Sequence, residues 1–143
     1  MPVAESRPAD WDEMMAVNLR GAYLACRAVL PAMVAQRRGT LILVGSMVTG
    51  RTLSGSAAYT ASKYGLLGLG RVLTEELRGS GVRVGVLAAG AVDTPLWDSI
   101  PGAPDRNLMI TPGQVAEVAL LMATLGANAA LEELTLMPAR GVL

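Results

Sequence analysis

The sequence predicts an α/β domain with a parallel sheet, and two observations support this prediction. Residues 40–45 form a continuous apolar run, Thr-Leu-Ile-Leu-Val-Gly, whose lack of polar alternation is typical of a strand covered on both faces. A helical segment at residues 59–78 separates this run from a second one at residues 82–87, so the order is strand, helix, strand. The chain has 143 residues, enough for a core of its own, and we expect residues 1–143 to form one domain.

The first element expected along the chain is a long helix. Asp10 and Glu13 stand three residues apart before an apolar stretch, which resembles a capping box, and the helix is predicted over residues 11–37. Pro31 lies inside this range, and its ring and missing N–H are expected to kink the helix or end it early. The helix at residues 59–78 has a clearer end, because Gly79-Ser80-Gly81 supplies a stop signal.

The remaining elements follow the second strand. Residues 96–110 show no regular pattern. Thr111-Pro112-Gly113-Gln114 combines a cap, a proline at the first helical position and a glutamine three residues after the cap, and predicts a helix to about Leu125. Residues 134–137 are predicted as a last short strand, which gives about three strands and three helices in all.

The composition excludes several classes of site. The chain has no histidine and one cysteine, so the usual zinc ligand sets, a Ser-His-Asp triad and an internal disulfide are ruled out, and we expect no metal. The 12 basic and 12 acidic residues cancel, whereas a nucleic-acid binder would normally carry a basic patch, so no nucleic-acid partner is expected.

The apolar character of the chain raises the question of a membrane. Mean hydropathy is +0.42, but the longest apolar stretch, residues 118–131, is interrupted by polar residues and shorter than the roughly 20 residues that a span needs. The first residues do not form a charged start followed by an apolar core. We therefore expect a cytoplasmic protein without a membrane partner.

Three polar residues are predicted to meet at one end of the sheet. Ser46 directly follows the first strand, and Tyr59 opens the next helix with Lys63 one turn later on the same side. An ammonium near a phenol favours the phenolate, so such a pair can exchange a proton with an alcohol or carbonyl near neutral pH. The alternative is an ordinary exposed pair on a helix, but Lys63 is the only lysine in the chain and falls four residues after one of three tyrosines.

These residues resemble a known catalytic arrangement. Ser46, the run Tyr59-Thr-Ala-Ser-Lys63 and Asn18 in Val-Asn-Leu-Arg-Gly resemble the catalytic tetrad of the short-chain dehydrogenase/reductase family. The resemblance implies that Tyr59 is the general acid/base and that Ser46 hydrogen-bonds the substrate oxygen. It further implies that Lys63 holds the nicotinamide ribose and that Asn18 positions a water linking Lys63 to solvent; otherwise Asn18 is an ordinary helix residue.

A fourth motif extends the resemblance to the cofactor. Residues 90–95, Gly-Ala-Val-Asp-Thr-Pro, are similar to the nicotinamide-binding segment of that family, although Ala89 stands where the family usually has proline. The resemblance implies binding of NAD or NADP through Gly90, Val92 and Thr94 together with Tyr59 and Lys63. It also implies a small alcohol or ketone as substrate; Thr94 could otherwise be a simple turn residue.

The resemblance covers only the second half of the family's pattern. The glycine-rich phosphate turn of such enzymes is missing from the sequence, so the implied fold is the second half of a Rossmann-type doubly wound sheet. The strand at residues 41–44 should then be flanked by a strand that this sequence does not encode. We expect a truncated or mis-started version of a longer enzyme, or a chain that needs another chain.

Two functions stay open from the sequence. One is an NAD(P)-dependent oxidoreductase of the short-chain type, and the other is a non-catalytic dimerisation or interaction module that keeps the motifs by descent. The resemblance implies a homo-oligomer that pairs through the helices at residues 11–37 and 59–78. Gly65, Gly68 and Gly70 in the second of these helices are expected to allow close helix–helix packing.

The irregular segment offers a candidate lid. Leu96, Trp97 and Met109 are among its apolar residues, so we expect them to cover a hydrophobic substrate. The competing interpretation, that these side chains are simply core, is equally compatible with the sequence.

Overall fold

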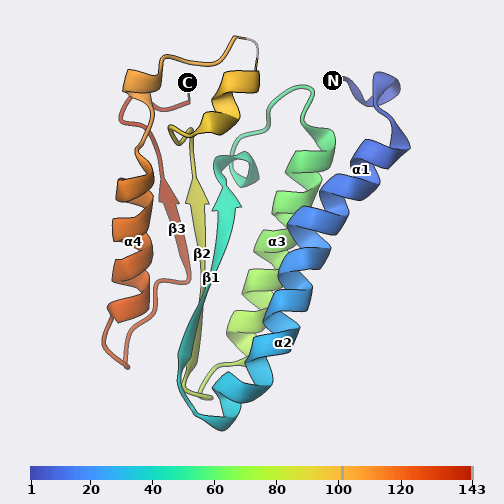
Figure 1. The fold of residues 1–143 in the computed structure, drawn as a ribbon. Helices are drawn as coiled ribbons and strands as arrows, with labels where there is room; N and C mark the ends of the chain where they lie inside the picture. Colours follow the sequence, from blue (N-terminus) through green and yellow to red (C-terminus); the bar gives the residue numbers. More distant parts are fainter. Residues whose placement is uncertain (101, 143) are drawn as a thin grey trace.

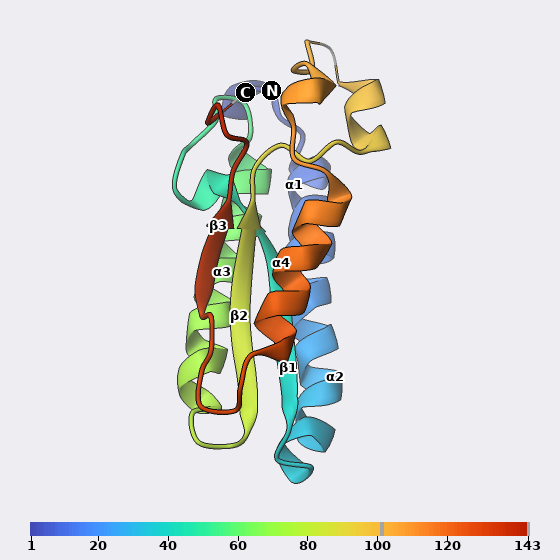
Figure 2. The same ribbon diagram turned by 90° about the vertical axis from the view of Figure 1, so that its left-hand side faces the viewer.

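A computed structural model describes residues 1–100 and 102–142, and it contains a three-stranded parallel sheet between two helical layers. The strands β1 (Gly39–Ser46), β2 (Val82–Ala89) and β3 (Glu133–Leu136) lie in the order β1-β2-β3, and each pair is parallel. One face carries α4 (Pro112–Thr124), and the other face carries the long helices within residues 8–35 and 57–76 (Figures 1 and 2). The predicted α/β class and parallel sheet are confirmed.

The first helical rod consists of three consecutive segments. These are α1 (Pro8–Met15), a π-helical turn at Ala16–Arg20 and α2 (Gly21–Ala35). The predicted extent is nearly right, but the predicted capping box is wrong. The helix begins at Pro8, and Asp10 instead accepts a hydrogen bond from Arg7 Nε at 3.0 Å. Pro31 does not end α2, which continues to Ala35, and the π-helical turn was not predicted.

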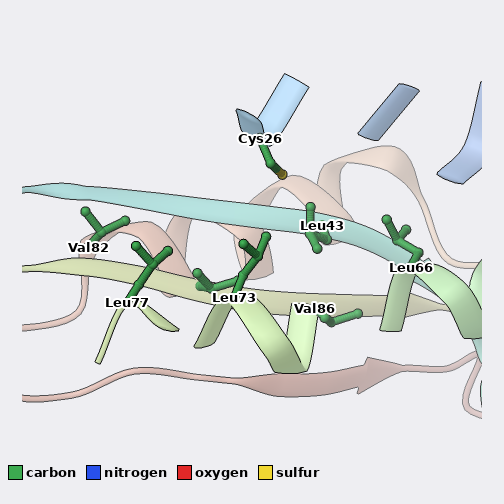
Figure 3. Close-up of a cluster of buried hydrophobic side chains, with 8 residues drawn as sticks. Cys26, Leu43, Leu66, Leu73, Leu77, Val82 and Val86 are labelled. Atoms are coloured by element: carbon green, nitrogen blue, oxygen red, sulfur yellow. The ribbon is translucent and has the colours of Figure 1, made fainter. Parts of the chain in front are cut away.

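The helix α3 (Ala57–Glu76) crosses from β1 back to β2 and supplies the main core. Leu66 and Leu73 of α3 pack with Leu43 and Val86 of the sheet, and Cys26 reaches the same cluster from α2 (Figure 3). All five side chains are buried. The core of this layer therefore lies between the helix pair and the first two strands.

Two of the three glycines in α3 allow close packing, each against a different partner. A Cβ at Gly65 would lie 2.6 Å from Leu19 Cδ2, so this glycine permits the predicted helix–helix contact with the first rod. A Cβ at Gly70 would lie 2.4 Å from Val86 Cγ2, so Gly70 packs on the sheet instead of a helix. Gly68 has no neighbour within 4 Å in this chain, so its predicted role in helix–helix packing stays a prediction.

The opposite layer begins as the sequence predicts. Thr111 Oγ1 accepts a hydrogen bond from Gln114 N at 3.2 Å, and Gln114 Oε1 accepts one from Thr111 N at 2.8 Å, which completes the capping box of α4. Met122 of α4 is buried against Gly85, where an added Cβ would lie 2.5 Å from Met122 Cε. None of the helices within residues 1–100 and 102–142 is both long and apolar enough to cross a membrane.

The two longer strands differ in how well they are covered. Leu87 of β2 is 0% exposed, as expected for a strand covered on both faces. In β1, Leu43 is buried, but Val44 is 55% exposed, so the same expectation fails at Val44. The reason is position in the sheet, because β1 pairs only with β2 among the described residues and its other edge is open.

Candidate functional site

The predicted polar residues gather where the strands end. Ser46 is the last residue of β1, and its register partner Ala89 is the last residue of β2, directly before Gly90. The first turn of α3, which contains Tyr59, lies at the same end of the sheet (Figure 1). Ligands of open α/β sheets bind beyond the carboxyl ends of the strands, so this is the expected place for a site.

Ser46 is buried, and its side chain is oriented by the turn that follows it. Its Oγ accepts a hydrogen bond from Val48 N at 3.4 Å, and its carbonyl accepts one from Thr49 Oγ1 at 2.9 Å. The residue caps the short turn Met47–Thr49. Because Oγ acts as an acceptor in this contact, its own proton can be donated to a ligand.

Tyr59 and Lys63 lie together in the first turns of α3. The Lys63 ammonium is 5.7 Å from the centroid of the Tyr59 ring, within the range of a cation–π contact. Lys63 Nζ also donates a hydrogen bond to the Val44 carbonyl at 3.0 Å. Burial lowers the pKa of Lys63 from its ordinary value of 10.5, because the charged form is poorly solvated there.

The Val44 carbonyl that accepts this bond lies on the open edge of the sheet. Val86 N donates to Glu132 O, so the main-chain groups of Val86 point toward β3. Those of the next residue, Leu87, point toward β1. Leu87 is the register partner of Val44, and a residue in a parallel ladder bonds to the neighbours of its partner. Val44 therefore faces away from β2, and Lys63 reaches around to the unpaired edge of β1.

Asn18 lies in the π-helical turn and contacts α3 through a residue that sequence reasoning missed. Asn18 Nδ2 donates to Ser62 Oγ at 3.1 Å and to Met14 Sδ at 3.0 Å. Ser62 is 0% exposed, and its hydroxyl donates to the Tyr59 carbonyl at 2.7 Å. Ser62 thus couples Asn18 to the helix turn that holds Tyr59 and Lys63. The only sequence signal for it is a small polar residue directly before Lys63.

Asn18 and Lys63 also line one groove, although no hydrogen bond joins them in the structure. The groove has a volume of about 550 Å³ and lies between α2 and the open edge of β1. Its walls are mainly apolar and include Cys26, Val29 and Val44. A water between Asn18 and Lys63 stays a prediction.

The segment that follows β2 is fixed by main-chain contacts. Gly90 N donates to Leu136 O at 2.9 Å, and a Cβ at Gly90 would lie 2.7 Å from Pro138 Cδ, so this close approach alone favours glycine. Val92 forms an isolated parallel bridge with Ile110. Thr94 lies before the short turn Pro95–Ser99, and its side chain does not cap that turn.

The three candidate lid residues have different environments. Leu96 is 66% exposed, Trp97 is half-buried, and Met109 is buried at 8%. Met109 therefore has the burial of a core residue, whereas Leu96 is free to contact a ligand. A role of these residues in covering a substrate stays a prediction.

The arrangement offers proton transfer and hydrogen bonding. Ser46, Tyr59 and Lys63 supply a hydroxyl, a phenol and an ammonium at one end of the sheet. Over the part of the chain that the structure describes, no three histidine, cysteine, aspartate or glutamate side chains gather as metal ligands would.

The sequence and the fold match known proteins. The family profile of the short chain dehydrogenases matches residues 1–104. The chain is 32% identical over 123 residues to a 3-oxoacyl-[acyl-carrier-protein] reductase of Thermotoga maritima, which covers 80% of this chain and 50% of that protein. It is 33% identical over 132 residues to D-threitol dehydrogenase of Mycolicibacterium smegmatis, covering 86% of this chain and 51% of that protein.

Solved structures agree with these relatives. A metagenomic short-chain oxidoreductase in complex with NADP superposes with a TM-score of 0.79 at 36% identity, covering 96% of this chain and 55% of that one. Serine dehydrogenase from Escherichia coli gives a TM-score of 0.86 at 27% identity, covering 99% of this chain and 59% of that one. The chain thus spans about half the length of the relatives it matches.

Proposed function

The chain belongs to the short chain dehydrogenase family, and from this premise we propose that it carries the catalytic half of an NAD(P)-dependent oxidoreductase. The reaction is hydride transfer between a nicotinamide and a small alcohol or ketone. The observation that carries the proposal is the Lys63 ammonium 5.7 Å from the Tyr59 ring, at the end of the sheet where Ser46 closes β1. Relatives named as reductases and dehydrogenases support the same class of reaction.

The roles of the side chains follow from their chemistry. The Tyr59 phenol exchanges a proton with the substrate oxygen, and Ser46 Oγ donates a hydrogen bond to that oxygen. Lys63 contributes positive charge beside the Tyr59 ring and a donor for the nicotinamide ribose. Ser62 and Asn18 hold the helix turn in place through the hydrogen bonds described above.

The residues present fit the nicotinamide end of the cofactor. The nicotinamide supplies the hydride when it is bound. Lys63, Val92 and Thr94 are the groups that would hold it, and Gly90 keeps the main chain close to β3 at this point. A doubly wound sheet consists of two mononucleotide-binding halves, and the sequence carries no glycine-rich turn for the other one. The choice between NAD and NADP depends on that other half.

The first experiment is a fluorescence titration of the chain with NADH, NADPH and reduced nicotinamide mononucleotide. If only the nicotinamide end is held, all three ligands bind with Kd values within about threefold of one another, because the adenosine part adds few contacts. Much tighter binding of one dinucleotide would contradict a nicotinamide-only site. Absence of saturable binding would contradict a nicotinamide site in this chain alone, and would mean that the motifs belong to a longer enzyme.

The second experiment separates binding from proton transfer. In Tyr59→Phe the Kd for reduced nicotinamide mononucleotide stays within about twofold, while ketone reduction falls by roughly 10²-fold or more, the usual contribution of a general acid. Tyr64→Phe is the matched control, since Tyr64 is an exposed tyrosine on the same helix. Equal turnover in Tyr59→Phe and the control would contradict the role of Tyr59.

We also propose that the chain pairs with a second copy through its helical layer. A groove of about 540 Å³ lies between the first rod and α3, with Met15, Leu19, Tyr23 and Leu69 in its walls. Its lining is largely apolar, and Gly68 on α3 leaves open space for an approaching helix. Contiguous exposed apolar surface of this kind marks an interaction site.

Sedimentation velocity tests this pairing. The wild-type chain is expected to sediment as a dimer at micromolar concentration, and Tyr23→Glu as a monomer, because a carboxylate would be desolvated in the contact. Tyr23 is 48% exposed, so the substitution leaves the core intact. Leu120→Glu on α4, 63% exposed in the opposite layer, is the control that stays dimeric. A monomeric wild type, or equal dissociation of both variants, would contradict the proposal.

A further inference from the structure

The segment after β2 is bonded through its main chain to Ile110, beside the candidate site. Ile110 N donates to Ala91 O at 3.0 Å, and Asp93 N donates to Ile110 O at 2.8 Å, on either side of the Val92–Ile110 bridge. Residues 91–94 and residues 109–110 therefore lie side by side. Main-chain hydrogen bonds hold one side of the proposed nicotinamide-binding segment, residues 90–95, against residues 109–110.

Side chains hold the other side of this segment. Arg106 Nη1 donates to Asp93 Oδ1 at 2.6 Å, and its second amino group donates to Asp98 Oδ1. Trp97 Nε1 donates to the Val92 carbonyl at 2.8 Å. Arg106 thus joins a carboxylate in the nicotinamide-binding segment to one in the turn Pro95–Ser99, and Trp97 ties that turn back to Val92.

This contact differs from the other arginine ion pairs of the described chain. The pairs Arg7–Asp10 and Arg78–Glu75 join residues three positions apart, and Arg71–Glu133 joins α3 to β3 away from the site. Arg78 also pairs with Glu132. The two carboxylates that Arg106 pairs with, those of Asp93 and Asp98, lie on either side of Thr94. The Arg106 guanidinium is planar with two forks of N–H groups, which suits a bridge between two carboxylates.

We propose that Arg106 is a positioning residue for the nicotinamide-binding segment. By holding Asp93 and Asp98 together it fixes the main chain between them, and so fixes Val92 and Thr94 in the conformation that receives the nicotinamide. The inference rests on the proposed function for its ligand. It adds a residue that acts through Asp93 and does not touch the ligand itself.

The effect is expected on ligand binding more than on folding. The side chain of Arg106 is 37% exposed and that of Asp98 71% exposed, and ion pairs with this exposure contribute little to stability. If a segment binds its ligand only when it is ordered, the apparent affinity equals the affinity of the ordered state multiplied by the fraction of molecules in which the segment is ordered. Loss of Arg106 should therefore weaken binding while the unfolding midpoint barely changes.

The test is a fluorescence titration of the full chain with reduced nicotinamide mononucleotide. In a Trp11→Phe background Trp97 is the only tryptophan, so energy transfer from Trp97 to the ligand reports the site. Arg106→Gln is expected to raise Kd at least fivefold, and Arg106→Lys nearly as much, because one ammonium does not replace the two-sided fork. Arg71→Gln, which breaks an exposed arginine pair elsewhere, is the matched control and should stay within twofold.

A double variant separates positioning from direct contact. If Arg106 acts through Asp93, then Asp93→Asn raises Kd to a similar degree, and combining it with Arg106→Gln adds little further. Full additivity of the two substitutions would overturn the positioning role in favour of a direct contact with the ligand. Wild-type Kd in Arg106→Gln, or an equal loss in Arg71→Gln, would also overturn it.

Hydrogen exchange keeps the inference testable apart from the proposed function. Without ligand, Arg106→Gln is expected to speed exchange of the Asp93 and Ile110 amides at least tenfold, with no change in Arg71→Gln. If the wild type fails to bind the mononucleotide, the proposed function fails, and the exchange rates still decide whether Arg106 orders the segment. Unchanged exchange of both amides would overturn that ordering.

Discussion

The two ends of the sheet use their polar side chains in opposite ways. At the amino end, Arg83 of β2 donates to the carbonyls of Ala123 and Leu125 at 2.8 and 2.5 Å and to Thr40 Oγ1 at 3.0 Å. At the carboxyl end, Lys63 donates to one main-chain carbonyl, Val44 O. The amino end therefore uses its charge to hold the fold, whereas the carboxyl end keeps donors and acceptors that a ligand can use.

The amino end of the sheet also has a hollow large enough for a ligand, so volume alone does not identify the candidate site. A hollow of about 780 Å³ lies at the amino end, with four arginines in its wall: Arg37, Arg38, Arg78 and Arg83. Arg83 is bonded to the end of α4, and Arg78 is paired with Glu75 and Glu132. At least two of the four arginines in this hollow are therefore engaged by the fold itself.

The largest effect is expected from removing Arg83. Arg83→Met keeps the length of the side chain but leaves Thr40 and the last carbonyls of α4 without their donor, which should lower the free energy of unfolding by about 1–3 kcal/mol. Urea unfolding measures the change. Arg38 is an exposed arginine at the same end, so Arg38→Met is the control, and its free energy of unfolding should stay within about 0.5 kcal/mol of the wild type.

The same variants sharpen the comparison through ligand binding. Arg83→Met should bind reduced nicotinamide mononucleotide with the wild-type Kd at temperatures where it is folded, because its contacts lie at the other end of the strands. A loss of binding without a loss of stability would show that the two ends do not divide their roles in this way.

The fold was largely predictable because its signals are local. The strand at residues 40–45, the helix that begins near Tyr59 and the capping box at Thr111 depend on apolar runs, turns and caps within a few residues. The exposure of Val44 in β1 was not predictable from its apolar run, because coverage depends on which strands lie beside it. The π-helical turn likewise has no signal in its own residues.

The site was predictable only where its residues are close in the sequence. Tyr59 and Lys63 share a helix, so their spacing brings them together. Asn18 and Ser62 are 44 residues apart, and their contact depends on how the first rod packs on α3. Arg106 stands 13 residues from Asp93, across a segment without a regular pattern, so no local pattern in the sequence indicates their contact.

The smallest expected effect has the opposite sign and comes from the carboxyl end. Burial lowers the pKa of Lys63 below its ordinary value of 10.5, so the folded state disfavours the charged form that is present at neutral pH. Lys63→Met should therefore raise the free energy of unfolding at pH 7. The gain should be under about 1 kcal/mol, because Lys63 is partly exposed and the bond to Val44 is lost with it.

The pH dependence gives this prediction its sign. Between the lowered pKa of Lys63 in the folded chain and 10.5, the unfolded chain binds more protons than the folded chain. The free energy of unfolding of the wild type therefore rises with pH over this range. This gain is lost as the pH falls through the folded pKa. Lys63→Met lacks this term, so its advantage over the wild type should shrink from pH 7 toward pH 10 in urea unfolding, while mononucleotide binding is lost at every pH. A variant less stable than the wild type at pH 7 would mean that Lys63 supports the fold as Arg83 does, and the two ends of the sheet would then be alike.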